Sequence, residues 1–173
     1  MSQPKQLLIA ADADFILQIQ AGIDPAIEAY TLLRRIRGFF VATPCVIQEL
    51  SEIAERGGPI GDLAANALAC LGTQLQIMAP PCDGLANGLA HMFAEELVRS
   101  GELSEDKYDD GLCLAQASLI GARLLVTNQP EFSEIKNLEI YFIKRDLNAV
   151  HPINVTTIKK FFDGAEAAAA KQK

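Results

Sequence analysis

The sequence predicts an α/β domain built on a parallel β-sheet. Short apolar runs alternate with longer amphipathic segments, which is the order typical of parallel strands joined by helices. The 173 residues suffice for one domain with a hydrophobic core, and half of them are hydrophobic, which argues against global disorder. One domain is therefore expected over residues 1–155, followed by a C-terminal helix and a frayed tail over residues 156–173.

The predicted strands are short and apolar. They occupy residues 7–11, 39–42, 74–78, 124–126 and 138–143. The length of each run, and the glycines, prolines and polar residues that flank them, favour strands over buried helices. We expect these strands to lie parallel, because helical segments separate most of them.

The predicted helices fill the segments between the strands. They cover residues 14–20, 24–33, 44–56, 62–70 and 85–98, a stretch that begins at 104 or 109 and ends at 120, and part of the C-terminal tail. Thr43 precedes Pro44 and Asp24 precedes Pro25, so each is expected to cap a helix whose first turn contains the proline. Gly121 is expected to end the helix before the strand at 124–126.

Composition excludes several classes of protein. The net charge of −7 argues against a general nucleic-acid binder, because phosphate binding normally depends on Lys and Arg. It does not exclude a metal enzyme, since metal-binding carboxylates themselves contribute negative charge. None of the four cysteines forms a CxxC or CxxH pair, so no zinc site is expected. We find no signal peptide and no membrane-length apolar run, and we therefore expect a soluble, cytoplasmic protein.

Acidic residues occur where the predicted strands and helices meet. Asp12 and Asp14 follow the first strand, and Glu49 lies in the helix after the second strand. Asp110 lies near the start of the helix that precedes the strand at 124–126. The carboxyl ends of parallel strands share one edge of a sheet, and ligand sites form there. Three segments far apart in sequence are thus expected to deliver carboxylates to one place.

Such a cluster has a chemical use. Like charges packed together repel and raise one another's pKa values, and a bound cation relieves that repulsion. Mg²⁺ and Mn²⁺ prefer carboxylate and water ligands. The reaction that most often uses this arrangement is hydrolysis of a phosphodiester, in which the metal activates a water and neutralises the developing charge.

Three segments resemble the PIN domain family, which includes the toxin nucleases of bacterial toxin–antitoxin pairs. They are LLIAADADFIL, PCVIQEL and DGLCLAQASLIGARLLVTNQPEF. The conserved acids of the family fall on Asp12, Glu49 and Asp110, and its Thr-Asn pair falls on Thr127 and Asn128. The resemblance implies a three-layer α/β/α fold with a small parallel sheet. It also implies a Mg²⁺- or Mn²⁺-dependent endoribonuclease that hydrolyses RNA through a metal-activated water.

The sequence departs from the family pattern at one position. Gln129 stands where the family usually has a further acid. The amide oxygen of a glutamine can bind a hard cation, but it does not bring the negative charge of a carboxylate. Glu131, Asp14 and Asp109 are candidates to compensate for the missing charge. Thr127 is expected to hydrogen-bond a metal-bound carboxylate, and Asn128 to hold the turn or orient a ligand.

Substrate and partners are predicted less directly. The densest basic cluster comprises Arg34, Arg35 and Arg37, and with Lys107 it is a candidate RNA-binding surface, although a helix C-terminus also favours cations. The family resemblance implies RNA as substrate, an antitoxin-like protein as a possible partner, and a possible homodimer. Membrane partners are not expected.

Two other functions remain open at this point. A PIN-type fold that has lost part of its metal site would act as a binding or scaffold protein, and Gln129 motivates this alternative. The DAD and LLVTN strings also resemble haloacid dehalogenase-type phosphatases. That family needs a paired-acid motif after the threonine, however, and the adjacent pair Asp109-Asp110 precedes Thr127.

Overall fold

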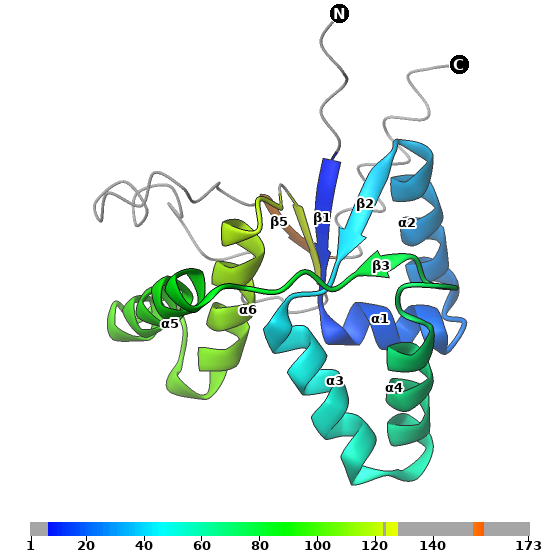
Figure 1. Cartoon of the computed structure of the whole chain (residues 1–173), viewed down its shortest axis with the longest axis horizontal. Coiled ribbons are helices and arrows are strands. Elements are labelled where there is room, and N and C mark those ends of the chain that lie inside the picture. Colours follow the sequence, from blue (N-terminus) through cyan, green and yellow to red (C-terminus); the bar gives the residue numbers. More distant parts are fainter. Residues whose placement is uncertain (1–6, 123, 128–153, 158–173) are drawn as a thin grey trace, which may run out of the picture.

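The computed structural model describes residues 7–122, 124–127 and 154–157, the last of these as backbone only. Within these ranges the chain forms an α/β fold (Figure 1). In chain order the elements are β1 (Leu7–Ala11), α1 (Ala13–Gln20), α2 (Asp24–Arg35), β2 (Gly38–Val41), α3 (Pro44–Arg56), α4 (Gly58–Cys70), β3 (Ile77–Met78), α5 (Gly84–Arg99), the 3₁₀ turn η1 (Glu105–Lys107), α6 (Tyr108–Leu119), β4 (Leu124–Thr127) and β5 (Asn154–Thr157).

The strands form one parallel sheet in the order β3-β2-β1-β4-β5. β1 lies at its centre, with Ile9 paired to Phe40 on one side and to Leu124 on the other. Every pairing in the described sheet is parallel, as the alternation of strands and helices predicts. All strands therefore end at the same edge, where β1 leads directly into α1 and β2 leads into α3.

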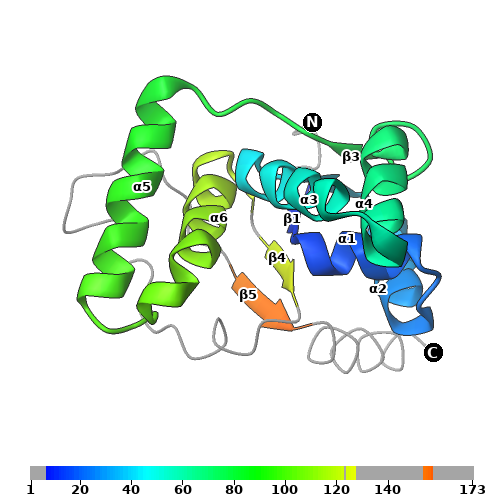
Figure 2. The same cartoon turned by 90° about the horizontal axis from the view of Figure 1, so that it is seen from below.

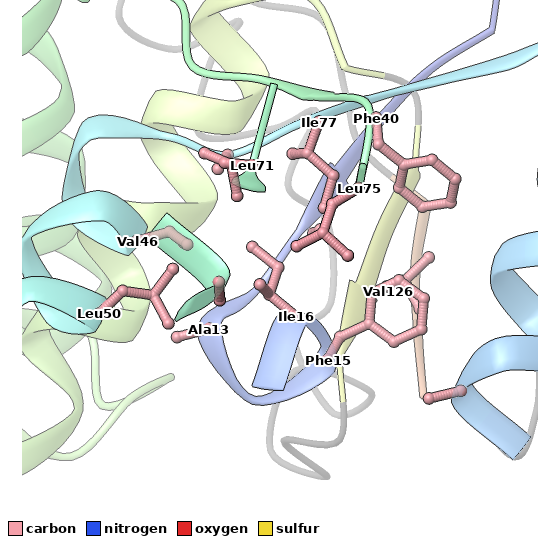
Figure 3. Packing of buried hydrophobic residues seen from close by; sticks show 14 of the residues in the cluster. Ala13, Phe15, Ile16, Phe40, Val46, Leu50, Leu71, Leu75, Ile77 and Val126 are labelled. Atoms are coloured by element: carbon pink, nitrogen blue, oxygen red, sulfur yellow. The ribbon is translucent and has the colours of Figure 1, made fainter. Parts of the chain in front are cut away.

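Helices cover both faces of the sheet and make three layers. Successive side chains of a strand point to opposite faces. Ile9 and Phe40 pack into a core shared with α1, α2, α3 and α4, and Figure 3 shows Phe15, Ile16 and Leu50 in the same core. Ala10 and Leu125 point the other way, into a second core with α5 and α6. The three-layer α/β/α architecture is confirmed.

Two glycines allow close packing. A Cβ atom at Gly38 would lie 2.7 Å from the Leu33 carbonyl oxygen, so only glycine lets β2 start directly beside the end of α2. A Cβ atom at Gly111 would meet Leu103 at 3.1 Å and the Ala94 Cα at 3.6 Å. The lack of a side chain at Gly111 thus serves the packing of α6 against α5.

Several predicted boundaries need correction. Asp24 does not cap α2: Ile23 occupies the cap position and makes no side-chain cap bond, while Asp24 and Pro25 belong to the first turn. β3 is limited to Ile77–Met78, because a turn with Gln76 at a φ of 50° precedes it. The helix boundary at Thr43 and the left-handed Gly121 (φ 89°) agree with the sequence.

Strand β5 was not predicted from the sequence. It pairs with β4 through Asn154–Thr157, so the sheet continues across the division expected between residues 155 and 156. The strand expected at 138–143 lies outside the described residues, as does the rest of the C-terminal segment. In the described part of the chain, no helix has the length and apolarity needed to span a bilayer.

Candidate metal and active site

Three helices meet at the edge where the strands end. α1 and α3 begin directly after β1 and β2, and α6 leads back into β4, so its first turn lies at the same edge. Figure 2 looks onto this edge and shows α1, α3 and α6 beside one another, and each of α1 and α6 contacts α3. The fold thus brings the segments carrying Asp12, Glu49 and Asp110 together.

Asp12 connects strand β1 to helix α1. Its Oδ1 atom accepts a hydrogen bond of 2.7 Å from the Phe15 N–H and so caps the helix. Its backbone N–H donates to the Val126 carbonyl at 3.3 Å, which ties the cap to β4. The side chain is only 8% exposed, and its Oδ2 atom has no hydrogen-bond partner among the described residues. Capping therefore accounts for one carboxylate oxygen and leaves the other available.

The environment of Asp12 disfavours its charge. Burial, above all, raises the pKa of Asp12 to about 7, and the nearby charges of Asp14 and Glu49 act in the same direction. The Thr127 hydroxyl and the Phe15 N–H oppose this rise because they stabilise the carboxylate. These hydrogen bonds compensate only part of the cost of an ionised Asp12, so its carboxylate would gain from a nearby cation.

Glu49 lies on α3, one turn after Cys45, and is exposed to solvent. Neighbouring protein atoms still displace water from its carboxyl group, and this desolvation is the main reason its pKa is raised. The charge of Asp110 is the next cause, followed by that of Asp14. The charges of acids on both α6 and α1 thus act on the carboxyl group of Glu49.

Asp110 lies in the first turn of α6, where the helix dipole favours an acid. Its Oδ2 atom lies 3.3 Å from the Lys107 Nζ atom. Asp109 precedes it and is exposed, and its carbonyl oxygen accepts a contact of 3.4 Å from the Cys45 Sγ atom. The site thus contains one lysine beside its acids.

Asp14 is a further carboxylate near the site. It is exposed on the first turn of α1 and accepts a hydrogen bond of 3.2 Å from Gln18. Its charge raises the pKa values of both Asp12 and Glu49. The other predicted contributors, Asn128, Gln129 and Glu131, lie outside the described residues.

The donor set suits a hard divalent cation. No three Asp, Glu, His or Cys side chains in the described ranges are close enough to hold one metal ion directly. Mg²⁺, however, usually retains several waters and uses only one or two protein carboxylates. The candidates for such ligands are the buried Oδ2 atom of Asp12, which has no hydrogen-bond partner in the described ranges, and the carboxylate of Glu49, whose charge acts on Asp12.

The arginine cluster does not border this site. Gly38, which follows Arg37, pairs with Leu7 at the start of β1, whereas Asp12 follows the end of that strand. At about 3.3 Å per residue, the two edges of the sheet are roughly 16 Å apart. The Arg34 guanidinium donates a hydrogen bond to the Gln76 side-chain oxygen. Figure 1 shows the α2–β2 junction at the end of the sheet opposite the starts of α1 and α3. Of the four basic residues predicted to bind RNA, the structure brings only Lys107 to the acids.

Sequence reasoning missed a buried polar cluster between α3, α5 and α6. Gln116 is 2% exposed, and its side chain bonds to the Cys45 N–H and to Asn87. Thr43, predicted only as a helix cap, also donates to the Cys113 Sγ atom at 3.6 Å. A polar residue on the otherwise apolar stretch LCLAQASL was the available signal, but its partners depend on how α3 and α5 pack against α6.

Comparison with protein-family models and with curated protein sequences finds no match to this chain. Among solved structures, the chain is similar to VapBC2 from Rickettsia felis bound to a DNA fragment from its promoter. The TM-score is 0.59 at 13% identity, over 87% of this chain and 98% of that one. It is also similar to VapBC-1 from nontypeable Haemophilus influenzae, with a TM-score of 0.54 at 13% identity, over 88% and 99% of the two chains.

Proposed function

Because the chain has the PIN-like fold predicted from its sequence, we propose that it is a divalent-metal-dependent ribonuclease. The observation that carries the proposal is the Oδ2 atom of Asp12, which is buried and unpartnered among the described residues, at the edge where Glu49 and Asp110 also lie. A buried carboxylate oxygen without a partner costs free energy, and a cation there offsets that cost.

In this proposal Asp12, Glu49 and Asp110 hold Mg²⁺ or Mn²⁺, directly or through water. Asp14 adds negative charge, and Gln129 and Glu131 are further candidate ligands. The bound cation supplies two effects: it lowers the pKa of a water, and it neutralises charge that develops on the phosphate. These effects account for hydrolysis without a side-chain nucleophile.

The residues of the chain prepare the site for that chemistry. The Phe15 N–H holds one oxygen of Asp12, and the other, which has no hydrogen-bond partner among the described residues, remains for a cation. The Thr127 hydroxyl favours the ionised form of Asp12, which is the form that binds a metal. Lys107 pairs with Asp110 and supplies a positive charge at which an RNA phosphate can be held.

Cleavage of a labelled RNA pool tests the proposal. Purified wild type is expected to cut RNA with Mn²⁺ or Mg²⁺ and not with EDTA. Asp12→Asn and Asp110→Asn should each lower the rate by at least about 100-fold, since metal-assisted steps contribute several kcal/mol. Asp62→Asn, an exposed acid on α4, is the matched control and should cut normally. RNA cleavage that persists in EDTA would contradict the proposal.

A scaffold or binding protein is the second candidate. It is favoured by the lack of three directly converging ligands among the described residues, and by Gln129 in place of an acid. A ligand that binds only the folded state raises its melting temperature. A scaffold should therefore show no rise with Mn²⁺, whereas the nuclease should show one that Asp12→Asn abolishes.

The same comparisons support a proposal about a protein partner. The similar solved structures are VapBC complexes, and we propose by analogy that an antitoxin-like protein binds this chain. Co-expression with the product of a neighbouring gene, followed by size-exclusion chromatography, tests this directly. The same chromatography on the isolated chain measures whether it forms the homodimer expected from the family resemblance.

A further inference from the structure

We propose that Gln116 is a positioning residue that holds Glu49 and Asp110 close enough to share one cation. The inference rests on the proposed metal-dependent function and concerns a side chain that touches neither metal nor substrate. Gln116 lies on α6, fully inside the protein, between the start of α3 and the start of α5.

Both ends of the Gln116 amide are used. Its Oε1 atom accepts a hydrogen bond of 2.9 Å from the Cys45 N–H, in the first turn of α3. Its Nε2 atom donates to the Asn87 Oδ1 atom at 3.0 Å, in the first turn of α5. A buried amide that satisfies two partners on two other helices fixes their mutual placement, since losing either bond leaves a polar group unpaired.

The first turn of α3 explains why this contact matters. A helix start leaves its first N–H groups without partners inside the helix. Pro44 has no N–H, and the Thr43 hydroxyl accepts from the Val46 N–H at 3.3 Å. The Ile47 N–H makes the first regular bond of the helix, to the Thr43 carbonyl at 3.0 Å. The Cys45 N–H remains, and Gln116 supplies its acceptor.

A second contact connects the same two helices. The Thr43 hydroxyl donates to the Cys113 Sγ atom, one turn before Gln116 on α6. The Cys45 Sγ atom also donates to the Asp109 carbonyl at 3.4 Å, so the start of α3 contacts α6 at three points. Glu49 follows Cys45 by one turn on α3, and Asp110 precedes Cys113 by one turn on α6.

These contacts between α3 and α6 oppose electrostatic repulsion between the two helices. Among neighbouring charges, that of Asp110 acts most strongly on Glu49. Without a cation the two carboxylates repel each other, which favours separation of α3 from α6. The Gln116 bond holds the helices together in that state, so the cation meets carboxylates that are already placed and less reorganisation accompanies binding.

Two variants separate this role from a general effect on stability. Gln116→Met keeps the length of the side chain but removes the acceptor for the Cys45 N–H. Asn87→Ala removes the other partner and leaves that bond intact. Two properties are measured for each variant: Mn²⁺ affinity by isothermal titration, and hydrogen exchange of the Cys45 amide in EDTA.

We expect Gln116→Met to weaken Mn²⁺ binding by about 10-fold or more, as for other residues that orient metal ligands, and to speed exchange of the Cys45 amide. In Asn87→Ala, the Mn²⁺ affinity and the exchange rate of the Cys45 amide should stay within about twofold of wild type. The loss of unfolding free energy should be comparable to that of Gln116→Met. Gln116→Asn, whose amide is one methylene shorter, replaces Gln116→Met if that variant does not fold, with the same result expected.

Equal Mn²⁺ affinity in Gln116→Met and wild type, or an equal loss in Asn87→Ala, would overturn the positioning role while leaving the metal site intact. Failure of wild type itself to bind Mn²⁺ would instead overturn the proposed function, and the positioning role with it. If the Cys45 amide exchanged at the same rate in Gln116→Met as in wild type, the Gln116 bond would not hold the start of α3.

Discussion

The carboxylate of Asp12 shows how one residue serves both folding and the candidate chemistry. One oxygen completes the start of α1, and the other is buried without a partner among the described residues. Its position was predictable, because an aspartate directly after a buried strand is placed by the strand itself. Its burial was not, since that depends on the packing of α1 against β4.

This burial predicts a pH dependence of stability. The pKa of Asp12 is raised to about 7 in the folded state, against an ordinary value of 3.8, so the folded state keeps the proton to higher pH. The free energy of unfolding in EDTA should therefore fall between about pH 4 and pH 7 and then level off. The full shift corresponds to about 4 kcal/mol.

Urea unfolding of wild type and Asp12→Asn measures this contribution. Asparagine is an equally good helix cap, so the variant keeps the start of α1 while removing the titrating group. Its unfolding free energy should fall less steeply over the same pH range. If the two proteins have parallel pH profiles, Asp12 does not carry the raised pKa.

At the scale of elements, the start of α3 carries a prediction about capping. Thr43 caps the helix with its hydroxyl and also contacts Cys113. Thr43→Val keeps the shape but removes both bonds, and should destabilise the protein by about 1–2 kcal/mol. Thr43→Ser, which keeps the hydroxyl, should cost less than half as much. Denaturant midpoints measure both, and an equal loss in the two variants would argue against the hydroxyl.

The junction between α2 and β2 carries a second prediction. A Cβ atom at Gly38 would lie 2.7 Å from the Leu33 carbonyl oxygen. This oxygen belongs to the backbone, so it cannot move away without disturbing the end of α2. Gly38→Ala should therefore lower the unfolding free energy by about 1–3 kcal/mol. Gly72→Ala is the control, because nothing lies within 4 Å of its Cβ position. A neutral Gly38→Ala would mean that the junction relaxes freely.

For the molecule as a whole, the placement of charge decides how RNA is held. Lys107 lies beside the acids, whereas Arg35 lies exposed at the opposite edge of the sheet. Lys107→Ala should raise KM for RNA several-fold and weaken its salt dependence, because a phosphate contact is lost. Arg35→Ala should leave both within about twofold. If Arg35→Ala raised KM more than Lys107→Ala does, RNA would instead bind across the edge of the sheet where the strands begin.

The sequence predicted the fold well for a specific physical reason. Strand and helix alternation together with Thr43 and Gly121 define most element boundaries, and parallel pairing follows from the connections. Strand β5 was missed, since its short run Asn154–Thr157 has no apolar core of its own and depends on pairing with β4. The role of Gln116 was missed because its partners come from other helices.

Binding of Mn²⁺ tests the central claim most directly, because the nuclease proposal depends on a cation at the carboxylate edge. Isothermal titration should show binding to wild type that Asp12→Asn weakens by at least about 10-fold, while Asp62→Asn on α4 binds as wild type does. Binding of Mn²⁺ that is equally strong in Asp12→Asn, or absent from wild type, would contradict the account.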